Sequence, residues 1–322
     1  MQLASTISGK FKNVDIISLD QFDPISIKKL FSLVPNMALI AKNSRPSTIL
    51  SGKIVTLLFY EPSSRTFASF AAAVKQLGGE TIDILDPRKF SSVSKGENFE
   101  DTIRVFEAYC DAIIIRHPEI GTAKKASEIA DLVPVINAGD GNGEHPTQAL
   151  LDLYTIFEKH KRLDNLTGVM VGDPLNSRTI HSLIKGLSLY RNNTIYLLSP
   201  KELMLTRKEF SVFKKKGIKL IEINDENYIP KDANFWYWTR VQKERFKDKK
   251  IYEKVKDSFY LTAELVKKYA GKKTILMDPL PRVGLIDMTV DLDPRSLYLR
   301  NQIRNGMYVR MALLVLLLGK IK

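Results

Sequence analysis

The chain has 322 residues, of which 44% are hydrophobic and 26% are charged, proportions that are typical of a folded globular protein. This length is long for one core and suits two domains. The longest apolar run, residues 311–318, is too short for a bilayer span, which takes about 20 residues. Residues 1–6 lack the basic and then apolar pattern of a secretory signal. We therefore expect a cytoplasmic protein with no membrane partner.

The formal net charge of +13 at pH 7 fits either a nucleic-acid binder or a protein that binds small anions. Nucleic-acid binders usually concentrate their basic residues in one stretch, whereas lysines here are spread from Lys10 to Lys322. We therefore expect no nucleic-acid partner. The single cysteine, Cys110, excludes an internal disulfide and a cluster of thiolate metal ligands.

Short apolar runs alternate with segments of helical period along the whole chain. The runs predict strands at 54–60, 81–85, 112–115, 133–137, 168–172, 194–198, 220–223, 235–238 and 274–277. The segments between them predict helices at 67–77, 99–108, 147–159 and 177–189. This alternation predicts an α/β fold in which helices cover both faces of parallel sheets.

The alternation restarts after a glycine-rich segment at 139–143. We therefore expect two doubly wound parallel-sheet domains, 1–144 and 145–299. The last segment, 300–322, has the composition of a helix and is expected to pack back on the first domain.

A group of potential phosphate ligands follows the first predicted strand. Ser63, Ser64, Arg65 and Thr66 place three hydroxyls and one guanidinium at a helix start, where free amides and the positive helix end also attract anions. The same residues would also suit a plain N-cap followed by a surface arginine. There is no Walker loop and no dinucleotide fingerprint. Read locally, the turn leaves both interpretations open.

The segment Glu-Pro-Ser-Ser-Arg-Thr at 61–66 resembles the Ser-Thr-Arg-Thr signature of the aspartate/ornithine carbamoyltransferase family. Six further blocks resemble the family in the same order and cover most of the chain: 94–97, 115–118, 145–152, 172–179, 239–246 and 279–282. The resemblance implies that 1–144 is a carbamoyl-phosphate-binding domain and 145–299 an aspartate-binding domain.

The resemblance also implies a role for each residue of the carbamoyl-phosphate site. The expected catalytic residues are Arg65, Thr66, Arg116 and His145. The expected ligands of carbamoyl phosphate are Ser63, Ser64, Arg65, Thr66, Arg116, His145, Gln148, Leu280 and Pro281, with Ser91 and Lys95 from a neighbouring subunit. His145 would donate a hydrogen bond to the carbamoyl oxygen, and Gln148 and the Leu280 carbonyl would hold the amide. A cis bond before Pro281 is expected.

Local readings of these residues are less specific. A histidine at a helix start, such as His145, is more often a cap or a structural residue. Arg116 ends an apolar strand, where it would either point into the ligand crevice of a parallel sheet or lie on the surface. His117 is interpreted as structural. By its composition alone, the polar segment 88–97 predicts a mobile surface loop. The resemblance implies instead that this segment contacts a neighbouring subunit in a homotrimer with shared active sites.

The second substrate is expected to be L-aspartate. The residues that resemble the family's aspartate ligands are Lys95, Arg178, Arg240 and Gln242, and Glu61 and Arg245 would orient Arg178. Separate guanidiniums suit the two carboxylates of aspartate, whereas ornithine would need an acidic partner for its side-chain amine. A basic solvated stretch is the alternative reading for Arg240 and Arg245.

The implied reaction needs neither a metal nor an organic cofactor, because the amine of the substrate is itself the nucleophile. Four positions depart from the family's commoner residues: Ser64, Phe67, Ser177 and Asp278. We expect Asp278 to rearrange its turn locally without abolishing activity. Two alternatives stay open, namely transfer to ornithine or a related amino acid, and a catalytically silent basic binding protein on the same fold. The sequence does not decide whether regulatory chains bind.

Overall fold

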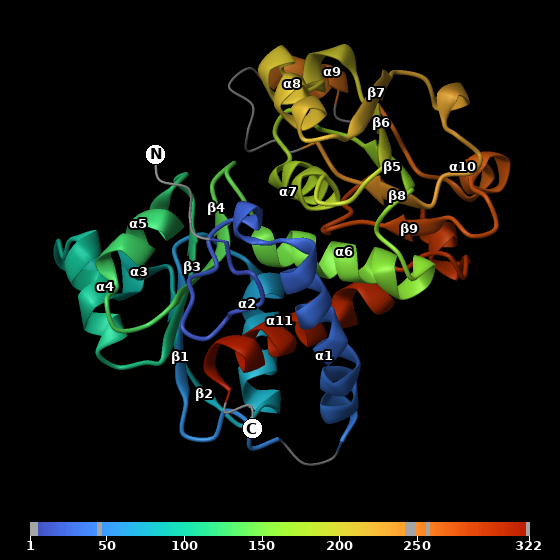
Figure 1. Ribbon diagram of the computed structural model, residues 1–322. Helices are drawn as coiled ribbons and strands as arrows, with labels where there is room; N and C mark the ends of the chain where they lie inside the picture. The colour runs from blue at the N-terminus through green and yellow to red at the C-terminus, as the bar shows by residue number, and fades with distance from the viewer. Residues whose placement is uncertain (1–5, 44–46, 242–248, 256–257, 320–322) are drawn as a thin grey trace. The chain divides into compact units, whose positions relative to one another are not determined.

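The computed structural model describes residues 6–43, 47–241, 249–255 and 258–319. The chain forms two compact units (Figure 1). Unit 1 holds Met1–Leu151 and Arg304–Lys322, and unit 2 holds Asp152–Ile303. Each unit is built on one parallel sheet, so the predicted α/β class with two parallel-sheet domains is confirmed.

The sheet of unit 1 has the strand order β2-β1-β3-β4. Its strands are β1 (Ile54–Phe59), β2 (Glu80–Leu85), β3 (Ala112–His117) and β4 (Val135–Asp140). β1 and β3 are the central strands and are almost wholly buried, as expected from their unbroken apolar runs. Each lies where the sequence predicts a strand, with ends that differ by a few residues.

Helices cover both faces of this sheet (Figure 1). α4 (Phe99–Glu107) and α5 (Thr122–Ile129) pack with β1 and β3 in one apolar core. α2 (Ser64–Gln76) packs at the other face, where the rings of Phe67 and Phe59 meet edge to face at 5.5 Å. α1 (Pro24–Lys42) begins at a proline behind the N-cap Asp23, whose carboxylate accepts the Ser26 amide at 2.7 Å.

The C-terminal helix α11 (Asn301–Leu318) returns to unit 1 from Arg304 onward. Its residues 309–318 are buried, which explains why all of them except Arg310 are apolar. Arg310 donates a hydrogen bond from Nη1 to Ser69 Oγ of α2 at 2.9 Å. The prediction that this helix packs back on the first domain is confirmed.

The sheet of unit 2 has the strand order β7-β6-β5-β8-β9. Its strands are β5 (Thr167–Val171), β6 (Thr194–Leu198), β7 (Lys219–Ile223), β8 (Phe235–Trp238) and β9 (Ile275–Met277). α10 (Ala263–Tyr269) joins β5, β8 and β9 in the main apolar core of the unit. The described part of the unit also contains α7 (Arg178–Leu187), α8 (Arg207–Lys215) and α9 (Lys249–Val255).

α6 (Pro146–His160) carries the point at which the two units divide, between Leu151 and Asp152. Its second half packs closely on α7 of unit 2. A Cβ on Gly186 would lie only 2.6 Å from Cδ1 of Leu153, so a larger residue there would force the Leu153 side chain to shift.

The segment 88–97 is more ordered than the loop predicted from its polar sequence. It forms a short helix α3 (Pro87–Phe90) and a 3-10 turn η2 (Ser92–Lys95). Pro87 starts α3, and the hydroxyl of Ser91 accepts the Val93 amide at 3.2 Å at the start of η2. Val93 packs against the core of unit 1. The sequence prediction missed these local caps because the segment is too short to show a helical period.

Candidate active site

The predicted phosphate turn lies at the carboxyl end of β1, where α2 begins at Ser64. Ser63 occupies the N-cap position, but its side chain makes no capping hydrogen bond. The plain N-cap interpretation of this serine is therefore wrong. Ser64 and Arg65 are exposed, whereas Thr66 is buried. The first amides of a helix have no partner within the helix, so the turn offers such amides in the same stretch of chain as its hydroxyls and its guanidinium.

Thr66 faces His145 within unit 1. Thr66 Oγ1 lies 3.4 Å from Nε2 of His145, and Thr147 Oγ1 lies 3.5 Å from Nδ1 of the same ring. His145 directly precedes α6 and is only 4% exposed. The backbone amide of Gln148 donates to the His145 carbonyl at 3.0 Å. The fold therefore brings the start of α2 to the start of α6, although the two lie about eighty residues apart in sequence.

Arg116 is held at the carboxyl edge of the same sheet. It pairs in register with Phe59, and its carbonyl accepts the Tyr60 amide at 2.8 Å. Its Nη2 forms an ion pair with Glu61 Oε2 at 2.7 Å, and its Nη1 donates to the Ala138 carbonyl at 3.2 Å. Arg116 is only 7% exposed, so the alternative of a surface arginine is wrong. Segments that follow or end β1, β3 and β4 jointly orient this guanidinium.

Glu61 therefore contacts a residue other than the one expected for it. The sequence predicts that Glu61 orients Arg178, which belongs to the other unit, and that contact stays a prediction. The ion pair with Arg116 was not predicted, because nothing in a linear sequence places the residue after β1 beside the end of β3. The strand order β1-β3 supplies that neighbourhood.

His117 occupies a structural position, as interpreted from the sequence. Its Nδ1 accepts the Glu119 amide at 3.1 Å, and its ring lies 4.7 Å from the ring of Tyr60. Burial lowers the pKa of His117 below its ordinary 6.5. The neutral ring can therefore accept that amide near neutral pH.

Two residues are expected to reach a neighbouring subunit. Lys95 is the last residue of η2, and Ser91 is its N-cap. The Ser91 hydroxyl donates to the Pro87 carbonyl at 2.7 Å. Lys95 is exposed at the end of the turn. The partner of Lys95 across subunits stays a prediction.

In unit 2, Arg178 and Arg240 follow adjacent strands. Arg178 opens α7 after β5, and Arg240 comes two residues after β8. β5 and β8 are parallel neighbours, so both arginines leave the sheet at its carboxyl edge. Both side chains are half-buried. Gln242 and Arg245 lie outside the described residues.

Ser177 departs from the glycine common in the family, and the structure gives it a local function. Its hydroxyl accepts the Ile180 amide at 3.4 Å as the N-cap of α7, and its φ of −84° needs no glycine. Ser177 therefore fits at the start of the helix that presents Arg178 without backbone strain.

The turn after β9 carries Leu280 and Pro281, and the peptide bond between them is cis, as predicted. Asp278 is buried, and its carboxylate accepts the backbone amide of Leu280. Its own amide donates to Gln302 Oε1 at 3.1 Å. The Asp278 side chain thus fixes the backbone of the turn from within.

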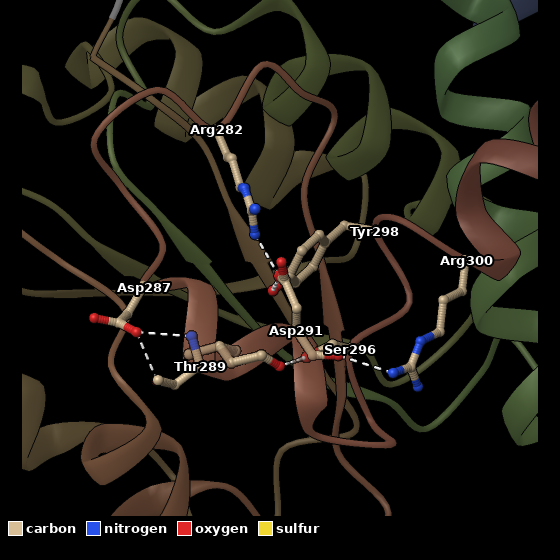
Figure 2. A network of polar contacts seen from close by, with 8 residues as sticks. Arg282, Asp287, Thr289, Asp291, Ser296, Tyr298 and Arg300 are labelled. Carbon is tan, nitrogen blue, oxygen red and sulfur yellow. Dashed lines mark hydrogen bonds and ion pairs between the residues drawn. The ribbon is translucent and has the colours of Figure 1, made fainter.

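A second polar network holds the other end of this turn (Figure 2). Arg282 donates to Asp291 Oδ1, and Tyr298 Oη donates to the same oxygen at 2.7 Å. Arg300 Nη2 donates to the Asp291 carbonyl at 2.8 Å. Burial acts to raise the pKa of Asp291, but the hydrogen bonds from Arg282 and Tyr298 outweigh it and lower the pKa below 3.8. Arg282 lies in the block 279–282 that resembles the family, but nothing in the sequence indicated Asp291, which lies in the short 3-10 helix η6 (Met288–Leu292) without a recognisable pattern.

Within the described residues, no group of three or more His, Cys, Asp or Glu side chains is placed to hold a metal ion. Among the same residues, no helix is both long enough and apolar enough to span a membrane.

Family models match both halves of the chain. The carbamoyl-P binding domain of aspartate/ornithine carbamoyltransferases matches residues 14–158, and the Asp/Orn binding domain matches residues 164–317. The chain belongs to the aspartate/ornithine carbamoyltransferase family.

Curated members of this carbamoyltransferase family resemble the chain over most of its length. The aspartate carbamoyltransferase catalytic subunit of Methanocaldococcus jannaschii is 45% identical, with 93% of this chain and 96% of the relative covered. The chloroplastic aspartate carbamoyltransferase of Arabidopsis thaliana is 42% identical, with 99% and 81% covered. The multifunctional protein pyr1-3 of Dictyostelium discoideum is 44% identical over 98% of this chain, which spans only 14% of that longer protein.

Solved structures of this carbamoyltransferase family share the fold. The M. jannaschii aspartate transcarbamoylase catalytic subunit superposes with a TM-score of 0.85 at 45% identity, covering 93% of this chain and 96% of that chain. Aspartate transcarbamoylase from Trypanosoma cruzi, in complex with carbamoyl phosphate and aspartate, gives 0.87 at 34% identity, covering 98% and 100%.

Proposed function

We propose that the chain transfers the carbamoyl group of carbamoyl phosphate to the amine of L-aspartate, an early step of de novo pyrimidine biosynthesis. The products are N-carbamoyl-L-aspartate and phosphate. The observation that carries the proposal is the cluster in unit 1: the turn of Ser63–Thr66 at the start of α2, His145 within 3.4 Å of Thr66, and the buried Arg116. This cluster supplies donors for a phosphate and for a developing oxyanion.

The proposed reaction uses these donors. The amine of aspartate attacks the carbamoyl carbon, and negative charge collects on the carbonyl oxygen. Thr66, His145 and Arg116 donate hydrogen bonds to that oxygen, and removal of one such donor typically lowers kcat about 10²–10³-fold. The bond between the carbamoyl carbon and the oxygen that bridges to phosphorus then breaks. Phosphate leaves and takes the proton of the amine. Ser63, Ser64 and Arg65 hold the phosphate, and Gln148 and the Leu280 carbonyl hold the carbamoyl amide.

Aspartate is assigned to the residues of the second half of the chain. Arg178 and Arg240 bind its two carboxylates, with Gln242 and with Lys95 of a neighbouring subunit. The names of the M. jannaschii and A. thaliana relatives support aspartate over ornithine as the acceptor. We accordingly propose 1–144, with the C-terminal segment 300–322, as the carbamoyl-phosphate-binding domain and 145–299 as the aspartate-binding domain.

A carbamoyl transfer assay with radiolabelled carbamoyl phosphate tests this function. Aspartate and ornithine are supplied in parallel reactions, and the labelled product is separated by ion exchange. Labelled carbamoyl aspartate is the expected result. Transfer to ornithine alone would refute the substrate assignment, and no transfer to either would favour a silent binding protein on this fold.

We also propose a homotrimer with shared active sites. The exposed position of Lys95 at the end of η2 supports the idea, because an exposed side chain is accessible to a neighbouring subunit. Two impaired variants, Arg65→Ala and Lys95→Ala, are mixed under conditions that exchange subunits and are assayed at low concentrations of both substrates. Hybrid trimers should regain activity because some sites then combine an intact turn with an intact Lys95. Verified hybrids without recovered activity would contradict shared sites.

We also propose a cytoplasmic location, because residues 1–6 lack the pattern of a secretory signal. The plant relative is named chloroplastic, so location varies within the family. Fractionation of the source cells, with the protein followed by an antibody, tests the assignment.

A further inference from the structure

A continuous chain of hydrogen bonds runs through the buried part of unit 2, and its centre is the carboxylate of Asp152. Tyr237 donates from Oη to Asp152 Oδ2 at 2.8 Å. Gln302 donates from Nε2 to Asp152 Oδ1 at 2.7 Å. Asp152 and Tyr237 are fully buried, and Gln302 is 2% exposed. A carboxylate removed from water in this way is held by its hydrogen-bond donors.

One branch of the chain leads from Asp152 to the turn after β9. The other end of the Gln302 amide, Oε1, accepts the Asp278 amide at 3.1 Å, and the Asp278 carboxylate accepts the amide of Leu280. Gln302 uses both ends of its amide, so its orientation is fixed: the reversed amide would place an NH₂ group against a backbone N–H. The carboxylate of Asp152 therefore sets the orientation of the residue that supports the Leu280 turn.

The other branch leads to the segments that present the proposed aspartate ligands. Tyr237 lies in β8, three residues before Arg240. Thr179, the residue after Arg178, lies close enough to Tyr237 to act on the pKa of its hydroxyl. Burial, and then the charge of Asp152, raises the pKa of Tyr237 well above 10, so the hydroxyl stays a donor at all working pH values.

We propose that Asp152 is a positioning residue, which ties the strand that presents Arg240 and the turn that presents Leu280 to helix α6. This inference rests on the proposed function, because it takes Arg240 as an aspartate ligand and Leu280 as a carbamoyl ligand. It goes beyond that function by assigning separate tasks to the two branches. The Tyr237 branch governs aspartate binding, and the Gln302 branch governs the orientation of the carbamoyl amide during the reaction.

The two branches predict different kinetic effects. Tyr237→Phe removes the hydroxyl and should raise the KM for aspartate about tenfold with kcat largely retained, the scale of one lost hydrogen bond to a buried charge. Gln302→Met keeps the side-chain volume but removes the amide that hydrogen bonds to both Asp152 and Asp278. It should lower kcat about tenfold, because small misplacements of a reacting group are costly. Asp152→Asn weakens both branches and should show both effects.

Tyr269→Phe is the matched control. Tyr269 lies in α10 of the same unit, is 7% exposed, and donates its hydroxyl to Asn227. It has no link to Asp152 among the described contacts. The substitution should leave both kinetic constants within about twofold of wild type, even if it lowers stability.

The experiment measures the KM for aspartate, the KM for carbamoyl phosphate and kcat for the full-length variants, with folding checked by circular dichroism. If Asp152→Asn does not fold, Tyr237→Phe and Gln302→Met still separate the branches. The proposal is overturned if both fold and keep wild-type constants, or if both change all three constants in the same proportion. Failure of the proposed function would look different, because the wild-type chain itself would then show no transfer to aspartate.

Discussion

The ion pair between Glu61 and Arg116 allows a direct test of how the carbamoyl-phosphate site is oriented. The perturbation is Glu61→Gln, which keeps the shape and one oxygen acceptor but removes the charge. The two groups lie 2.7 Å apart, with side chains 25% and 9% exposed. A full charge pair at such a site is worth about 4 kcal/mol at an effective dielectric constant of about 20.

Solvent at Glu61 and the retained amide oxygen reduce the loss to about 1–2 kcal/mol. Only the contribution of one donor is disturbed, so the effect should be smaller than the roughly 10²–10³-fold loss that follows removal of an oxyanion donor. We therefore expect kcat to fall about tenfold, because Arg116 keeps the Ala138 carbonyl as an acceptor but loses its charged partner.

Steady-state assays with aspartate at saturation measure this effect. The matched control is Asp111→Asn, since Asp111 pairs with Lys53 at 2.6 Å at the amino edge of the same sheet. The control removes a carboxylate charge from an ion pair far along β3 from Arg116, and should leave kcat unchanged. Wild-type kcat in Glu61→Gln, or an equal fall in both variants, would refute the idea that Glu61 orients Arg116 for catalysis.

Three further predictions concern stability, pH and substrate binding. Arg310→Met should lower the free energy of unfolding, measured by urea denaturation, by about 3 kcal/mol. The substitution removes a charged hydrogen bond to Ser69 and a guanidinium that lies 5.0 Å from the centre of the Phe70 ring. A loss below about 1 kcal/mol would contradict this prediction. Burial lowers the pKa of His160 below 6.5, so its contribution to stability is present above pH 6.5 and is lost as pH falls through the lower folded-state pKa. His160→Gln should therefore lose less unfolding free energy than wild type between pH 7.5 and 5.5, and an unchanged pH dependence would argue against it. Arg65→Ala should raise the KM for carbamoyl phosphate about 30-fold or more, the scale of a lost charged hydrogen bond; inhibition by inorganic phosphate should weaken in parallel, and wild-type values for both would remove Arg65 from the site.

The sequence by itself determined the elements and the kind of chemistry. Strands such as β1 and β3 were found because a buried central strand needs an unbroken apolar run, and that requirement is visible in contiguous residues. The proposed phosphate turn could be recognised as a candidate for a similar reason, since Ser63, Arg65 and Thr66 are neighbours in the chain. The blocks that resemble the family then indicated the reaction, because each block is a run of neighbouring residues and the blocks follow the family's order along the chain.

Tertiary structure decided how those groups are supported. Arg116 meets Glu61 only because β3 lies beside β1, and Thr66 meets His145 only because two distant helix starts converge. Periodicity does not encode strand order or the approach of helices, so neither contact could be read from the sequence. Asp152 is the strongest instance. In the sequence it is one carboxylate in a helix, whereas burial beside Tyr237 and Gln302 makes it a fixed acceptor for two separate branches. Such an arrangement depends on which residues the fold removes from water together.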